Sequence, residues 1–360
     1  MKRLSQCALV LVLCSCGHNP EESRPWPDGA RYYVGWPTCP DTSLAFSPGG
    51  DVLLFCSSAS GNPGIYGFDG VGSPSLRTFS SYDEFTGPTG CWCDTTAQDS
   101  LGKIIYAAVR DDGTGEIRWI SGNSYNVHMI LYDSLPNMDP TWSPLADSIV
   151  FCSKTDGAWG LWHGAVASTV VPEPLYCPSG DCVRPSYSPD GQWILFQHRD
   201  SEASDWDIWM VRPDGTDAHA VIEGSSQDIQ PTWAPAGHSG WFAFSSDRTG
   251  NFEIWVSDMQ GDSLLQVTDD PADDIYPAWS PGGDMWIAFS ADRASDPGEF
   301  DIFWLPDPLQ GVSYKNPQIR NQLRDNWLDP GPRRVCRPDA LLPQHQDPSA
   351  SRLLNSSSRF

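Results

Sequence analysis

Basic side chains are scarce in this chain. Its 360 residues include 22 Lys and Arg against 46 Asp and Glu, which gives a formal net charge of −24. Nucleic-acid binding needs basic patches that neutralise phosphates, so the composition disfavours that function. The same charge argues against an electrostatic hold on an anionic membrane surface.

No apolar run reaches transmembrane length. The run CALVLVLC at 7–14 follows Lys2 and Arg3 and is too short to span ~30 Å of hydrocarbon, which is typical of a signal peptide. L-C-S-C at 13–16 resembles a bacterial lipobox and implies that Cys16 is diacylated; an ordinary signal peptide with incidental cysteines is the alternative. We expect a signal peptide at 1–15, and at 16–30 a tether to the lipid anchor.

Common catalytic and metal-binding patterns are missing. We find no G-x-S-x-G, no H-E-x-x-H and no Gly-rich phosphate loop with Lys-Ser/Thr. The seven His are scattered, and the acidic clusters do not match an EF-hand loop. We therefore expect no cofactor and no metal; a metal site assembled from separate parts of the chain, or weak Ca²⁺ binding, is the alternative.

An aromatic residue followed by Ser-Pro or Ala-Pro recurs along the chain, as in TWSPLADSIVF, SYSPDGQWILF and AWSPGGDMWIAF. With one weaker copy that lacks Ser-Pro, the aromatic anchors are Phe46, Trp92, Trp142, Tyr187, Trp233 and Trp279. Their spacing of 45 to 50 residues defines six repeats.

Each repeat contains the pattern of four short strands. A Pro-Asp-Gly-like turn follows the anchor, then an apolar run such as WILF, an alternating strand such as DIWMV and a short strand such as AVI. Four short strands in this length are typical of a propeller blade, and no helical period separates them. We predict an all-β fold, a six-bladed β-propeller over residues 31–305.

The sixth repeat lacks an outer strand after Leu305. RYYVGW at 31–36 offers one, so we predict that this N-terminal strand closes the ring and leaves no open sheet edge. Tyr32 and Val34 would then match Leu265 and Val267 of the preceding repeat.

The anchor motif, x-x-P-x-W-S-P-[DG]-G, resembles the TolB-like β-propeller repeat, a WD40-like (PD40-type) repeat. The resemblance covers roughly residues 31–305. It implies a six-bladed propeller with an interaction role in the bacterial envelope.

In the TolB-like repeat, the residue five before the anchor is commonly Asp. The corresponding acidic or amide residues are Asp41, Asn137, Asp228 and Asp274. The link between blades crosses one face near the axis, so these side chains would surround one mouth of the central channel and contact a partner or a cation. The alternative is that each caps its own turn by accepting hydrogen bonds from backbone N–H groups.

Cysteine pairing is left open by the sequence. An exported protein would oxidise suitable pairs, and plausible ones are Cys177 with Cys182 and Cys39 with Cys56. No C-x-x-C spacing is present, which disfavours a zinc ribbon.

Residues 306–360 differ from the repeats, with eight basic and five acidic side chains and no strand alternation. We expect a C-terminal tail with little fixed structure. A degenerate seventh blade that starts at Trp327 is the alternative.

The acidic charge and the missing motifs favour a lipid-anchored, non-enzymatic protein–protein interaction scaffold. We expect a monomer on the outer membrane, facing the periplasm or the cell surface, with an envelope protein as its partner and no nucleic acid. The alternatives are a propeller enzyme, such as a polysaccharide lyase or hydrolase, and a small-ligand sensor, each using the central channel. Basic or His side chains that converge on the channel would favour an enzyme.

Overall fold

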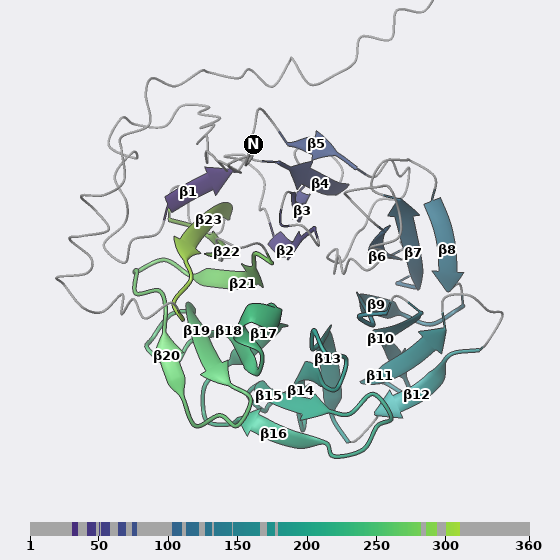
Figure 1. The fold of residues 1–360 in the computed structure, drawn as a ribbon. Coiled ribbons are helices and arrows are strands. Elements are labelled where there is room, and N and C mark those ends of the chain that lie inside the picture. Colours follow the sequence, from purple (N-terminus) through teal and green to yellow (C-terminus); the bar gives the residue numbers. More distant parts are fainter. Residues whose placement is uncertain are drawn as a thin grey trace, which may run out of the picture.

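The β-sheets are arranged in a ring around a central axis in a computed structural model of the chain (Figure 1). The structure describes residues 31–34, 42–47, 50, 52–57, 64–69, 74–77, 103–109, 113–121, 127–131, 133–145, 147–165, 171–176, 179–281, 286–293 and 300–309. Helical structure in these ranges is limited to the 3₁₀ turn η2 (Ala236–His238). None of their helices is long and apolar enough to cross a membrane.

Six blades in the described residues form the ring, which confirms the predicted fold class. Blade 1 contains β2 (Thr42–Phe46), β3 (Leu53–Ser57), β4 (Gly64–Phe68) and β5 (Ser75–Leu76). Blade 2 has as its described strands β6 (Lys103–Val109), β7 (Gly115–Ser121) and β8 (Val127–Leu131). Blade 3 contains β9 (Asn137–Trp142), β10 (Ser148–Thr155), β11 (Ala158–Ala165) and β12 (Glu173–Tyr176).

The second half of the ring follows the same order. Blade 4 contains β13 (Asp181–Tyr187), β14 (Ile194–Arg199), β15 (Asp207–Val211) and β16 (His219–Ile222). Blade 5 contains β17 (Asp228–Trp233), β18 (Trp241–Ser246), β19 (Glu253–Asp258) and β20 (Leu264–Gln266). Blade 6 contains β21 (Asp274–Trp279), β22 (Trp286–Ala291), β23 (Asp301–Pro306) and, as its outer strand, β1 (Arg31–Val34).

The N-terminal strand β1 closes the ring by pairing antiparallel with β23, as predicted. By this pairing, Val34 occupies the position in blade 6 that Val267 occupies in blade 5, which is also as predicted. Tyr32 matches Gln266 rather than Leu265. The predicted alignment of Tyr32 was therefore wrong by one residue, because a register shift between Tyr32 and Val34 inserts an extra position.

Apolar side chains join each blade to the next. In the described residues, six hydrophobic clusters lie between neighbouring blades around the whole ring. One of them joins Phe46 and Phe55 of blade 1 to Ile302 and Trp304 of blade 6. Closure therefore rests on side-chain packing between these blades as well as on the backbone pairing of β1 with β23.

The anchor residues end the inner strands β2, β9, β13, β17 and β21, as the repeat predicted. The serine after the anchor stabilises the turn that follows: Ser188 Oγ accepts hydrogen bonds from the backbone N–H groups of Gln192 and Trp193, at 3.1 and 3.0 Å. Gly191 in this turn has a φ of 69°, a conformation that glycine adopts without steric cost. The Ser-Pro-Asp-Gly motif is thus explained by the turn. Trp92 lies outside the described residues.

Candidate binding site at the channel mouth

Each described inner strand bulges three residues before its anchor, where its register with the second strand shifts. The residues at these bulges have φ values of 49° to 57°: Ser43, Asp139, Arg184, Gln230 and Tyr276. In all but blade 1 the next residue is proline, which has no N–H group to donate to the ladder and therefore fits a bulge. A positive φ is unfavourable for such residues, and conformations of this kind collect at functional sites.

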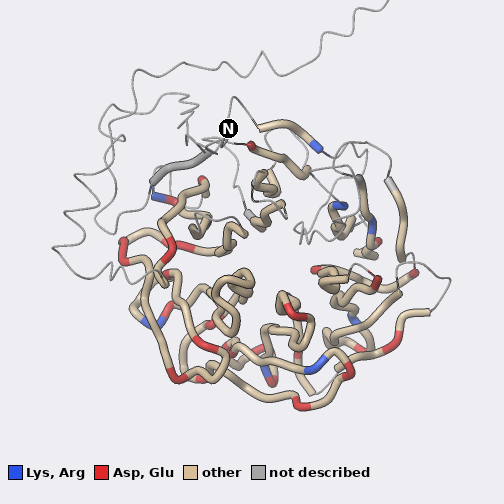
Figure 2. Tube along the Cα trace, in the orientation of Figure 1, with Lys and Arg blue, Asp and Glu red and all other residues tan. Residues whose placement is uncertain are grey.

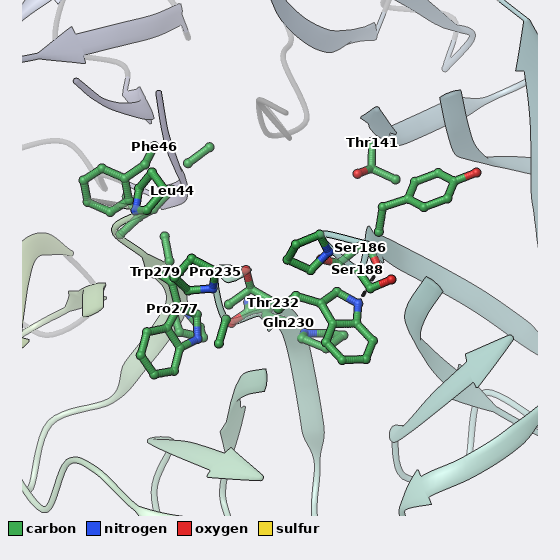
Figure 3. Close-up of a pocket in the computed structure, with 18 of the residues that line it drawn as sticks. Leu44, Phe46, Thr141, Ser186, Ser188, Gln230, Thr232, Pro235, Pro277 and Trp279 are labelled. Carbon is green, nitrogen blue, oxygen red and sulfur yellow. Dashed lines mark hydrogen bonds between the residues drawn. The ribbon is translucent and has the colours of Figure 1, made fainter. Parts of the chain in front are cut away.

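A pocket of about 510 Å³ lies at the end of the channel where the inner strands finish. It is lined from the bulge residues up to the turns after the anchors, by residues of blades 1, 3, 4, 5 and 6. Figure 3 shows Leu44 and Phe46 on one side of the opening and Thr141 on the other, with Gln230 and Thr232 between them. We call this opening the anchor-side mouth.

Prolines and aromatic residues make up much of the pocket wall. The prolines form two levels, one next to the bulges and one in the turns: Pro185, Pro231 and Pro277, then Pro144, Pro189, Pro235 and Pro281. The aromatic lining residues are Phe46, Trp142, Tyr187, Trp233, Tyr276 and Trp279. Among the described lining residues, Arg184 alone carries a formal charge, which contrasts with the acidity of the whole chain.

Arg184 connects three blades at the floor of this pocket. Its Nη1 lies 3.4 Å from Asp139 Oδ1 of blade 3, and its Nη2 donates a hydrogen bond of 3.3 Å to the hydroxyl of Tyr276 in blade 6. The guanidinium also lies over the Tyr276 ring, 5.2 Å from its centroid. Burial alone would lower the pKa of Arg184, but the Asp139 carboxylate beside it raises that pKa, so the side chain stays charged.

Gln230 holds the floor together from blade 5. Its Oε1 accepts hydrogen bonds from the backbone N–H of Tyr276, at 2.8 Å, and from Ser245 Oγ, at 3.0 Å. Its own backbone N–H donates to Gln197 Oε1 at 2.9 Å. These bonds fix the backbone at two neighbouring bulges, so the positions of Gln230 and Tyr276 are set before any ligand binds.

The sequence-predicted site residues lie at the other end of the inner strands. Asn137, Asp228 and Asp274 begin β9, β17 and β21, and all three are buried. Asp228 Oδ1 accepts a hydrogen bond from Arg248 Nη2 at 2.7 Å, and Asp274 Oδ1 accepts one from Arg293 Nε at 2.9 Å.

Asn137 is also held within the protein. Its Nδ2 donates to Asp133 Oδ1 at 2.7 Å and to the carbonyl oxygen of Gly115 at 3.0 Å. The structure thus buries Asn137, Asp228 and Asp274 and ties each of them to groups nearby. A binding role for them stays a prediction, as it does for Asp41, which lies outside the described residues.

Burial raises the pKa of Asp228, although hydrogen bonds from Ser246 and Arg248 and the positive charge of Arg248 oppose this shift. Its Oδ2 has no hydrogen-bond partner among the described residues. A carboxylate in this position costs stability unless its cation stays in place, which favours a role inside the blade.

Other predicted features are tested only in part. Cys16, Cys39 and Cys177 lie outside the described residues, so lipidation and both cysteine pairings stay predictions.

Cys152 has a free, buried thiol, and burial raises its pKa well above the ordinary value. Within the described ranges, no group of three or more His, Cys, Asp or Glu side chains could hold a metal ion.

The sequence analysis missed the bulge residues. One signal could have revealed them: the repeat keeps its proline and its anchor, whereas the residue before the proline changes from Asp139 to Arg184, Gln230 and Tyr276. A position that changes while its surroundings repeat is free to carry specificity. Its left-handed conformation and its place on the pocket floor are consequences of the bulge.

Comparison with known proteins places the chain in a family. Residues 101–297, more than half of the chain, match the TolB beta propeller domain family, PD40, and the chain belongs to this family. An uncharacterised protein of Agrobacterium fabrum is 26% identical over 191 residues, which cover 51% of this chain and 58% of the relative. The chain thus spans 58% of the length of that curated relative.

Two solved structures are similar in fold. A structure described as a TolB from Agrobacterium tumefaciens has a TM-score of 0.57 at 20% identity and covers 74% of this chain and 91% of its own. Oligogalacturonate lyase from Vibrio parahaemolyticus has a TM-score of 0.51 at 13% identity and covers 79% of this chain and 98% of its own. The fold is therefore shared with an enzyme as well, and function has to be argued from the site.

Proposed function

We propose that this protein is an interaction module that binds a protein partner at the anchor-side mouth. The observation that carries the proposal is the absence of acidic side chains from the described pocket lining of a chain with a net charge of −24. Figure 2 shows most Asp and Glu toward the outside of the ring. The mouth is an apolar surface on an otherwise acidic molecule.

Leu145 extends this apolar surface to the rim. It follows the pocket-lining Pro144 in the turn after β9, and its side chain is 82% exposed. Asp190 lies at the corresponding position two residues after Ser188, where the chain follows the Pro-Asp-Gly pattern. Leu145 adds to the apolar area of the pocket walls, and contiguous exposed apolar patches mark protein-binding sites.

The described part of the pocket lining lacks a feature that we expect of an enzyme acting in the channel. An enzyme acting on acidic sugars would need basic or His side chains that converge on the channel. Among the described residues that line the pocket, Arg184 is the one basic side chain, and no His is present. An interaction surface needs no such convergence, and the lining prolines, which lose little entropy on binding, suit it well.

A lipid anchor at Cys16 forms part of the proposal. It rests on the L-C-S-C motif that follows the apolar run and the two basic residues. An anchored propeller would be held at the envelope, where a partner could reach the mouth. Mass spectrometry of the membrane-extracted protein should find diacylglyceryl-Cys16 as the first residue, and an unmodified N-terminus elsewhere would contradict the anchor.

Charge placed at the rim tests the binding surface. Leu145→Glu should abolish capture of the partner from solubilised envelopes. Ala203→Glu is the matched control, because Ala203 is exposed in the loop between β14 and β15, on the opposite face of the ring. A partner retained equally by both variants would show that binding occurs elsewhere.

A further inference from the structure

Arg184 has donors that the protein leaves unused. A guanidinium carries five N–H donors. Within the described residues its one side-chain hydrogen bond goes to the Tyr276 hydroxyl, and Asp139 contributes a contact of 3.4 Å without hydrogen-bond geometry. The side chain is 24% exposed and lines the pocket, so its remaining donors can be reached from the mouth.

Asp139 offsets the positive charge of Arg184 without accepting a hydrogen bond from it. Its carboxylate is buried, with a side-chain exposure of 1%, and neither oxygen has a hydrogen-bond partner among the described residues. Asp139 is not part of the pocket lining. Its charge therefore holds the guanidinium in place from behind, while the front of the guanidinium faces the pocket.

We propose that the floor of the anchor-side mouth binds a carboxylate, carried by an apolar group of the partner and held by Arg184. This deepens the proposed function and rests on its choice of the mouth. Two parallel N–H···O bonds match a guanidinium to a carboxylate, and the proline and aromatic walls suit an apolar group behind the charge. A dianion such as phosphate fits less well, because Asp139 already offsets one positive charge.

Small probes test the floor without the partner. Benzoate carries a carboxylate on an apolar ring, benzamide is its neutral analogue, and inorganic phosphate is an anion without an apolar body. Dissociation constants can be measured by saturation-transfer NMR with the full protein. Benzoate should bind about tenfold or more tightly than benzamide, because a carboxylate accepts stronger, charge-assisted hydrogen bonds from the guanidinium than a neutral amide does.

Variants assign that preference to Arg184. Arg184→Met alone would leave Asp139 as an uncompensated buried charge and could unfold the protein, so Arg184→Met is combined with Asp139→Asn. The double variant should lose the preference for benzoate. Asp139→Asn alone should strengthen benzoate binding several-fold, because the guanidinium is no longer offset. Arg212→Met, in the same blade but outside the pocket lining, is the matched control and should bind like the parent.

Three results would overturn the proposal: equal binding of benzoate and benzamide, an unchanged preference in the double variant, or displacement of benzoate by phosphate at a lower concentration than benzoate itself needs. The outcome is separate from that of the proposed function. If Leu145→Glu loses the partner but benzoate shows no preference, the mouth remains the partner-binding surface and the carboxylate site is rejected. If benzoate shows the preference but Leu145→Glu still captures the partner, the floor binds carboxylates and the mouth is rejected as the partner-binding surface.

Discussion

Asp181 Oδ2 accepts hydrogen bonds from Arg199 Nε at 3.0 Å and from Arg199 Nη2 at 2.8 Å. Asp228 and Arg248 make the equivalent ion pair in the next blade. Asp181 lies directly opposite Arg199 in the ladder of blade 4, whereas in blade 5 Arg248 lies two residues after Ser246, the ladder partner of Asp228. An ion pair thus joins the inner and second strands in both blades, although Arg-Asp replaces the Asp-Arg order and the two residues are placed differently along the strands.

This ion pair predicts that the acidic residues before the anchors stabilise the fold. Asp228→Ala removes a fully buried carboxylate and leaves Arg248 unpaired, so the free energy of unfolding should fall by about 3 kcal/mol. Urea denaturation measures the change. Asp262→Ala, at an exposed position, should be nearly neutral. A normally stable Asp228→Ala that loses the partner would instead support the predicted role in binding.

Ring closure gives a second prediction. Deleting residues 31–36 removes β1, exposes the edge of β23 and leaves blade 6 with three strands. The variant should aggregate or lose partner binding, because the unpaired backbone edge of β23 becomes open to other chains. Size-exclusion chromatography and thermal melts check this. A deletion variant that is monomeric and melts like the parent would refute the closure.

The C-terminal boundary is tested by a pair of truncations. Asp307 is buried and bonds to His238 Nε2 of blade 5 at 2.5 Å, and Leu309 packs against the cluster between blades 5 and 6. Ending the chain after residue 310 should leave the melting temperature nearly unchanged. Ending it after Pro306 should cost about 2 kcal/mol. A large loss from the first truncation would contradict the expectation that the tail has little fixed structure.

Glu253 predicts a pH dependence. Burial raises its pKa above the ordinary value of 4.5, although Thr268 Oγ1 donates a hydrogen bond of 2.6 Å to it. The folded protein therefore binds this proton more tightly than the unfolded chain does. The ionised side chain costs stability at neutral pH, and this cost is recovered as the pH falls through the raised pKa toward 4.5.

Glu253→Gln should remove that contribution. As the pH falls from 7 toward 4.5, the free energy of unfolding of the parent should increase relative to that of the variant. Glu202→Gln, at an exposed position, is the control and should run parallel to the parent. Denaturation curves at several pH values give the slopes. Parallel slopes for Glu253→Gln and the parent would exclude a raised pKa.

The sequence predicted the repeat count, the anchors that the structure describes and the closing strand, because each depends on local patterns that recur at a fixed spacing. It placed Tyr32 one residue wrong, because a bulge in an edge strand has no signature in those patterns. The pocket floor was not predicted at all. Arg184, Asp139 and Tyr276 meet only through the curvature of the ring, and their direction depends on bulges whose sequence signal is a proline at the next position.

The anchor-side mouth as the binding surface is the central claim, and site-specific photocrosslinking tests it most directly. A benzophenone side chain replaces Leu145 in one variant and Ala203 in the other, and both are irradiated in intact envelopes. We expect a discrete adduct with one protein from position 145 and none from position 203. An adduct from position 203 with none from position 145 would contradict the account.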